Sequence, residues 1–119
     1  MSFESDLEFL QNEFSAGDDS FLIQLRIDLH WDRTAFNRLT DAMLRHCRAQ
    51  TSEEKVSLWI AQGFWYLSTW VRDWTTHPDF PRPEPPEYYE RAYSRLYELA
   101  DVYFAGDGAW LNGTGFDPL

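Results

Sequence analysis

The chain has 119 residues with a net charge of −10 at pH 7, and its 18% aromatic content comprises six Trp, six Tyr and nine Phe. This length suits a single domain, residues 1–119, whose hydrophobic core needs neither disulfides nor metal for stability. Because phosphate groups repel so acidic a surface, the composition excludes general affinity for nucleic acid or for anionic lipid.

The sequence carries no sign of a membrane segment or of a secretory signal. Polar residues interrupt every stretch that approaches the roughly 18 apolar residues of a membrane-spanning helix. No basic, apolar and small-residue signal stands at the N-terminus. The single cysteine, Cys47, has no partner for an internal disulfide, which agrees with a reducing compartment. We therefore expect a cytoplasmic protein.

The first predicted element is a short helix over residues 2–14. Ser2 is a suitable N-cap, and acidic residues in the first two turns complement the positive end of the helix dipole. Residues 15–20 predict a turn, in which Asp19 or Ser20 is placed to cap the next element. The apolar positions of the helix follow helical spacing: Phe3, Leu7, Leu10 and Phe14.

Residues 21–31 are ambiguous between strand and helix. Apolar residues alternate from Phe21 to Trp31, which is typical of a β-strand. However, no second strand is predicted elsewhere, and a lone strand leaves its backbone groups unpaired unless it pairs across a dimer axis. We favour a helix with Leu22, Leu25 and Leu29 on one face.

Residues 33–48 predict a helix that begins after Asp32, a good N-cap. Thr51 or Ser52 is placed to cap the following helix. The positions expected to face inward are Phe36, Leu39, Met43 and Cys47.

The helix predicted over residues 53–76 organises the rest of the chain. One face follows spacings of three and four, and further apolar residues widen it or lie on the opposite side. A helix that is apolar nearly all round is usually packed on more than one side. The principal face is Val56, Ile60, Gly63, Leu67, Trp70 and Trp74; Trp59, Phe64 and Val71 widen it, and Leu58, Trp65 and Tyr66 lie opposite.

The C-terminal part begins with a Pro-rich connector, residues 77–86, which predicts an extended segment. A helix follows over residues 87–105, with Gly106 placed to end it. The tail, residues 107–119, contains Trp110, Leu111 and Phe116, which we expect to pack against the helices. The sequence thus predicts an all-α protein: a compact bundle of four to five helices, with 53–76 central and with 33–48 and 87–105 on two sides of it.

No motif for catalysis, cofactor binding or metal binding is evident. Asp28, His30 and Asp32 would share a face on a strand, but on a helix they diverge. His46 and Cys47 are adjacent, so on a helix they point about 100° apart and form no nucleophile–base pair. We expect no enzyme, no cofactor and no metal site.

The leading hypothesis is a non-enzymatic protein-binding module that binds a basic protein, as an immunity-like or inhibitor-like protein or an adaptor would. Bacterial immunity proteins of several unrelated families are similar to this chain in size and charge, without a shared motif. Tyr and Trp are common in interface hot spots. The candidate partner-binding residues are Glu4, Asp6, Glu8, Glu13, Asp18, Asp19, Trp65 and Tyr66.

Two alternatives belong to other classes. The first is a small-ligand or cofactor pocket between the aromatic-rich helices, where Gly63 would allow a ligand to approach closely. The second is a structural subunit of a larger assembly, or a homodimer, that uses residues 21–31 or exposed tryptophans as its interface.

Overall fold

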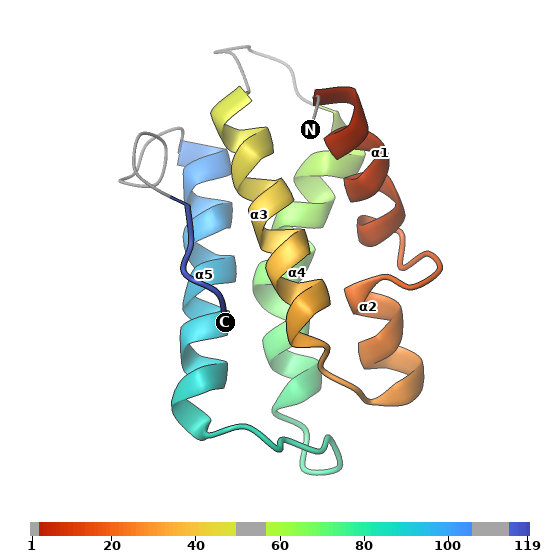
Figure 1. Cartoon of the computed structure of the whole chain (residues 1–119), viewed down its shortest axis with the longest axis vertical. Helices are drawn as coiled ribbons and strands as arrows, with labels where there is room; N and C mark the ends of the chain where they lie inside the picture. Colours follow the sequence, from red (N-terminus) through yellow and green to blue (C-terminus); the bar gives the residue numbers. More distant parts are fainter. Residues whose placement is uncertain (1–2, 50–56, 106–114) are drawn as a thin grey trace.

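The computed structural model describes residues 3–49, 57–105 and 115–119, and all regular structure within these ranges is helical (Figure 1). The chain folds as the predicted all-α bundle. Its elements are α1 (Phe3–Phe14), α2 (Phe21–Ile23), a short π-helix η1 (Gln24–Asp28), α3 (Arg33–Ala49), α4 (Leu58–Thr75) and α5 (Pro86–Ala105).

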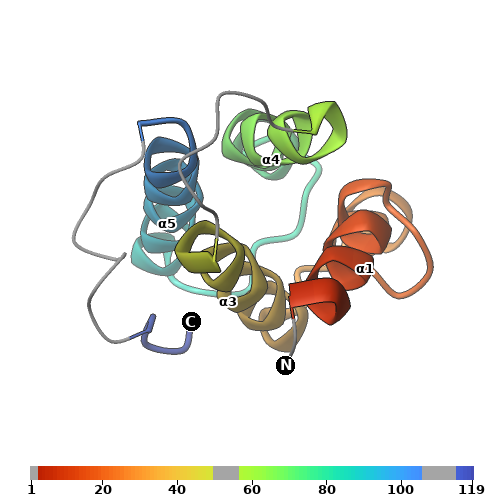
Figure 2. The same ribbon diagram turned by 90° about the horizontal axis from the view of Figure 1, so that it is seen from above.

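The four long helices pack around one core, with α4 beside α5 and α1, and α3 beside α1 and α5 (Figure 2). The helix predicted at 53–76 was expected to pack between the helices predicted at 33–48 and 87–105. It does pack against α5, but its second main neighbour is α1 and not α3. The start of that prediction, residues 53–56, lies outside the described residues, as do the proposed caps Ser2, Thr51 and Ser52.

The buried face of α4 is rotated from the predicted one. Trp70 is only half-buried and Trp74 is exposed, whereas Phe64 and Val71, which were expected at the edge, are fully buried. The predicted face followed apolar spacings of three and four, which several faces of a helix that is apolar nearly all round can satisfy. Large aromatic rings can also stack on one another along the surface of a helix. Here the Trp70 ring stacks between those of Tyr66 and Trp74, with ring centroids 5.5 and 5.4 Å away.

Residues 21–28 form a helical segment, as favoured over a strand. Ser20 caps it, since its Oγ accepts a hydrogen bond from the amide of Ile23 at 3.1 Å. The segment ends where Leu29 adopts a left-handed conformation, with φ +48°. This conformation is unusual for a residue with a side chain. Leu22 and Leu25 are buried as predicted, but the prediction that Leu29 shares their face is wrong: the helical segment ends at Asp28, and Leu29 is exposed.

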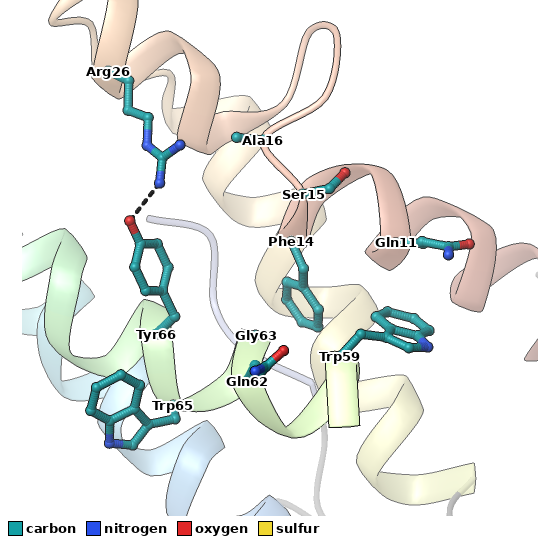
Figure 3. Close-up of a pocket in the computed structure, with 10 residues that line it drawn as sticks. All are labelled: Gln11, Phe14, Ser15, Ala16, Arg26, Trp59, Gln62, Gly63, Trp65 and Tyr66. Carbon is teal, nitrogen blue, oxygen red and sulfur yellow. Dashed lines mark hydrogen bonds between the residues drawn. The ribbon is translucent and has the colours of Figure 1, made fainter. Parts of the chain in front are cut away.

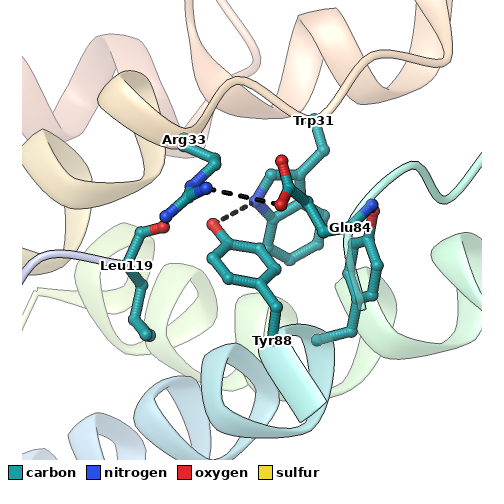
Figure 4. Close-up of polar contacts among 6 residues, drawn as sticks. Trp31, Arg33, Glu84, Tyr88 and Leu119 are labelled. Atoms are coloured by element: carbon teal, nitrogen blue, oxygen red, sulfur yellow. Dashed lines mark hydrogen bonds and ion pairs between the residues drawn. The ribbon is translucent and has the colours of Figure 1, made fainter. Parts of the chain in front are cut away.

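Trp31 joins the N-terminal half of the chain to α5. Its indole Nε1 donates a hydrogen bond to the hydroxyl of Tyr88 at 2.9 Å (Figure 4). The guanidinium of Arg33 lies 4.7 Å from the centre of the Tyr88 ring, pairs with Glu84 at 3.4 Å and donates to the backbone oxygen of Leu119. This cluster holds the start of α3, the connector and the tail together.

The end of the tail packs on α3 and α5. Leu119 is buried, and its amide donates to Oδ1 of Asn37 at 2.9 Å. The guanidinium of Arg95 donates to the carbonyl of Asp117 and lies 4.3 Å from the centre of the Phe116 ring. The predicted packing of Phe116 is thereby confirmed, whereas Trp110 and Leu111 lie outside the described residues.

Within the described ranges, no helix combines the length and the hydropathy that crossing a membrane requires.

Candidate functional site

Two of the predicted partner-binding residues are buried inside the bundle, and the first is Asp6. It is only 4% exposed, and its two carboxylate oxygens accept hydrogen bonds from Arg45 at 2.9 and 3.0 Å. This hydrogen bonding raises the pKa of Arg45 above its usual value. Asp6 thus links α1 to α3 and is not available to a partner.

The second is Glu13, which is 3% exposed. Its Oε1 accepts a hydrogen bond from the amide of Phe21 at 3.2 Å, so it ties the end of α1 to the start of α2. Burial raises the pKa of Glu13 to about 6, although this hydrogen bond and the charge of Arg38 act in the opposite direction. In the sequence, the charge of Asp6 and Glu13 gives no sign that these two side chains are buried while other acidic side chains are exposed.

The remaining acidic candidates differ in position. Glu8, Asp18 and Asp19 are exposed, and the two aspartates lie in the turn after α1. The side chain of Glu4 lies outside the described residues. The acidic surface of the N-terminal region is therefore smaller than its sequence suggests.

The histidine and cysteine residues do not assemble into a catalytic arrangement. Asp28 and His30 are exposed, and Asp32 accepts a hydrogen bond from the amide of Ala35 at 3.0 Å, as the predicted cap. Cys47 is buried, and burial raises its pKa to about 12. Burial also lowers the pKa of His46. Among the described residues, no group of three or more His, Cys, Asp or Glu side chains is placed to hold a metal ion.

Trp65 and Tyr66, also predicted to bind a partner, line a cavity of about 630 Å³ between α1, η1 and α4 (Figure 3). Trp65 is 59% exposed and Tyr66 is half-buried. The Arg26 guanidinium reaches across the cavity from η1 and donates a hydrogen bond to the hydroxyl of Tyr66.

Gly63, on the wall of this cavity, serves packing within the bundle. A Cβ at this position would lie 2.1 Å from an atom of the Phe14 ring. Gly63 therefore allows Phe14 of α1 to pack closely against α4 at this point. Gly63 also lines the cavity, so the expectation that it admits a ligand there stays a prediction.

A second surface lies on the outer side of α4 and α5. Four large apolar side chains there are exposed, and we call them the α4–α5 stripe: Leu58 (71%), Trp65 (59%), Tyr97 (68%) and Phe104 (57%). The two helices are antiparallel neighbours. Arg72 on α4 and Glu90 on α5 pair at 3.8 Å, which shows that these two positions lie opposite each other on the outer faces.

The pairing of Arg72 with Glu90 indicates that the four residues of the α4–α5 stripe lie on one surface. Trp65 and Leu58 lie seven and fourteen residues before Arg72, while Tyr97 and Phe104 lie seven and fourteen residues after Glu90. Seven residues make almost two helical turns, so each step returns to nearly the same face. The spacing was visible in the sequence, but only the helix pairing places the two halves on one surface.

Acidic residues of α5 accompany the stripe. Four of them are exposed, and we call them the acidic row: Glu87, Glu90, Glu98 and Asp101. Glu90 pairs with Arg72, and Glu98 borders a surface hollow that Arg91 and Arg95 also line. An apolar strip beside a row of carboxylates is complementary to a partner that is apolar on one side and basic on the other.

The chain matches no protein-family model, no curated protein and no solved structure.

Proposed function

We propose that this protein is a non-enzymatic binding module that holds an amphipathic helix of a basic protein on the α4–α5 stripe. The observation that supports the proposal is the exposure of four large apolar side chains on one surface. At about 200 Å² for each side chain, these fractions leave about 500 Å² of apolar surface in water, which is at the level of functional patches on single-chain proteins.

The shape of the stripe favours a helical partner. Two antiparallel helices present parallel rows of large side chains, and the residues three positions after Leu58, Trp65 and Tyr97 are small and half-buried: Ala61, Ser68 and Ala100. Helices commonly bind by placing one apolar face between two such rows. Trp65 and Tyr97 belong to the residue types that contribute most to interface energy.

Charge favours a basic partner over a second copy of the chain. A copy would bring a second acidic row and another net charge of −10 to the same surface. Basic residues beside the apolar face of a partner would add attraction to the acidic row.

The test uses a synthetic amphipathic helix with leucine on one face and lysine on the other, and measures its affinity by titration calorimetry. We expect the double variant Trp65→Ser, Tyr97→Ser to bind at least about tenfold more weakly than the wild type. A peptide of the same composition in scrambled order is the control, because it keeps the charge but loses the apolar face. Equal binding of both peptides would contradict the proposal.

Charge reversal locates the binding face. Glu98→Lys with Asp101→Lys changes the net charge by the same amount as Asp18→Lys with Asp19→Lys, on the turn after α1. We expect the first pair to weaken binding more, and added salt to weaken it further. A larger effect of the second pair would instead place the partner at the N-terminal acidic residues.

Capture from the host then identifies the natural partner. Tagged wild-type protein and the Trp65→Ser, Tyr97→Ser variant are exposed to the same lysate, and sedimentation reports whether the wild type self-associates. A basic protein that the wild type retains and the variant loses supports the proposal. Self-association that the variant abolishes would assign the stripe to a homodimer instead.

A further inference from the structure

The cavity between α1, η1 and α4 differs in charge from the rest of the molecule. The chain has 20 acidic residues against 10 Lys and Arg. Among the described residues that line this cavity, however, the only charged side chain is Arg26. The one charge on the described lining is therefore positive, and this favours an anionic occupant.

The guanidinium of Arg26 is held in place without a carboxylate. It lies 5.1 Å from the centre of the Trp70 ring and 5.7 Å from that of Tyr66. Across the described part of the chain, no acidic side chain lies within ion-pair distance of it. An arginine ordered on aromatic rings retains donors for an incoming carboxylate.

The backbone that carries Arg26 is irregular. Arg26 lies in the π-helix η1, which ends at the left-handed Leu29. The indole of Trp74 donates to the carbonyl of Leu25 at 2.8 Å and so supports this segment from α4. Short π-helical turns and strained backbone are frequent at functional sites.

Tyr66 provides a second donor next to Arg26. Its hydroxyl oxygen accepts the hydrogen bond from Arg26, so its own proton is left to donate (Figure 3). A carboxylate in the cavity would thus meet a guanidinium and a phenol together, and hydrogen bonds to a charged acceptor are the stronger kind.

The rest of the lining suits a flat apolar body. Trp59 and Phe14 supply aromatic surface, Gln62 supplies an amide, and Trp65 borders the cavity from the other side of α4 (Figure 3). The volume of about 630 Å³ lies within the ~300–1,000 Å³ that is usual for small-molecule sites.

From these features we infer that the cavity binds a small aromatic carboxylate, with its acid group on Arg26 and Tyr66 and its ring against Trp59. This site is separate from the α4–α5 stripe except for Trp65, which borders both. Protein binding at the stripe and ligand binding in the cavity can therefore be tested independently.

The probes are 2-naphthoate and its neutral isostere 2-naphthamide, titrated to about 1 mM. Binding is followed by calorimetry and by the NMR signals of the indole N–H groups. We expect 2-naphthoate to bind about tenfold more tightly than 2-naphthamide, and to shift the Trp59 signal more than that of Trp31, which lies in the core. Equal affinities, or no binding of 2-naphthoate, would overturn the inference.

Variants separate charge from shape. Arg26→Gln should remove the preference for the acid over the amide, and Tyr66→Phe should reduce it. Gln62→Trp should weaken both probes by filling the cavity. The matched control is Arg91→Gln, an exposed arginine of α5 outside the cavity, which should leave both affinities unchanged. Thermal unfolding of each variant verifies that it is folded, and retention of the preference in folded Arg26→Gln would contradict the assignment.

Tyr97→Ser connects this test to the proposed function. Tyr97 belongs to the stripe but does not line the cavity. We expect this variant to bind 2-naphthoate like the wild type. Its loss of peptide binding would then report only on the stripe, and failure of either proposal would leave the other intact.

Discussion

At the scale of single residues, Glu13 is the clearest case of a buried ionisable group whose charged form destabilises the fold. A carboxylate is less well solvated when buried, so the protonated form is favoured and the pKa rises from 4.5 to about 6. The folded state thus binds a proton more tightly than the unfolded state. The contribution of Glu13 to the stability of the folded protein is therefore most favourable below pH 4.5. This contribution decreases as the pH rises towards 6.

We therefore predict that Glu13→Gln is more stable than the wild type at pH 7, by up to about 2 kcal/mol. The glutamine carbonyl can still accept the hydrogen bond from Phe21, while the buried charge is removed. The difference between the two proteins should disappear when urea unfolding is repeated at pH 4. A lower stability of the variant at pH 7 would mean that the ionised carboxylate is stabilising. Comparison with the variant is needed because burial of His46 lowers its pKa, which gives the opposite trend.

Cys47 supports a prediction about reactivity. Its thiol is buried with a pKa of about 12, and only the thiolate is an effective nucleophile. We expect a thiol reagent such as Ellman's reagent to modify Cys47 at the rate of unfolding in native buffer, and rapidly in urea. Rapid modification of the folded protein would show that the thiol is accessible and would reopen a reactive role.

At the scale of helices, the contact of α1 with α4 depends on Gly63. Alanine here gains up to about 1 kcal/mol in helix propensity, but its Cβ would overlap the ring of Phe14. Overpacking of this kind costs about 1–3 kcal/mol. We predict that Gly63→Ala is destabilising overall, as measured by thermal unfolding.

A double-mutant cycle tests the cause. If the overlap with Phe14 is responsible, Gly63→Ala should be neutral or stabilising in a Phe14→Ala background, because only the gain in propensity remains. If both backgrounds show the same loss, another contact is responsible.

At the scale of the whole molecule, the end of the tail closes the bundle over α3 and α5. Leu119 is buried at 5% exposure. We predict that Leu119→Ala lowers the free energy of unfolding by about 2 kcal/mol, as measured by urea denaturation. The neighbouring Pro118 is exposed, so Pro118→Ala should have little effect. Equal effects of the two substitutions would show that the side chain of Leu119 is not what anchors the tail.

The sequence by itself determined most of the helical segments and where most of them end, but it left residues 21–31 ambiguous between helix and strand. The signals for these helices act within a few residues of the chain, so a local pattern is enough to predict them. They are the helical spacing of apolar residues, the caps Asp32 and Ser20, and the prolines of residues 77–86. The burial of Phe36, Leu39, Met43 and Cys47 was predictable for the same reason, since one face of an amphipathic helix must leave water.

Only the tertiary structure decided which polar groups are buried and which surfaces remain exposed. The sequence suggests that Asp6 and Glu13 are exposed acidic residues. In the structure both are buried, where Arg45 donates hydrogen bonds to Asp6 and the amide of Phe21 donates one to Glu13. The α4–α5 stripe and the Arg26 cavity each join residues from separate elements. Burial and complementarity depend on neighbours that are distant in the chain, and periodicity within one helix does not specify those neighbours.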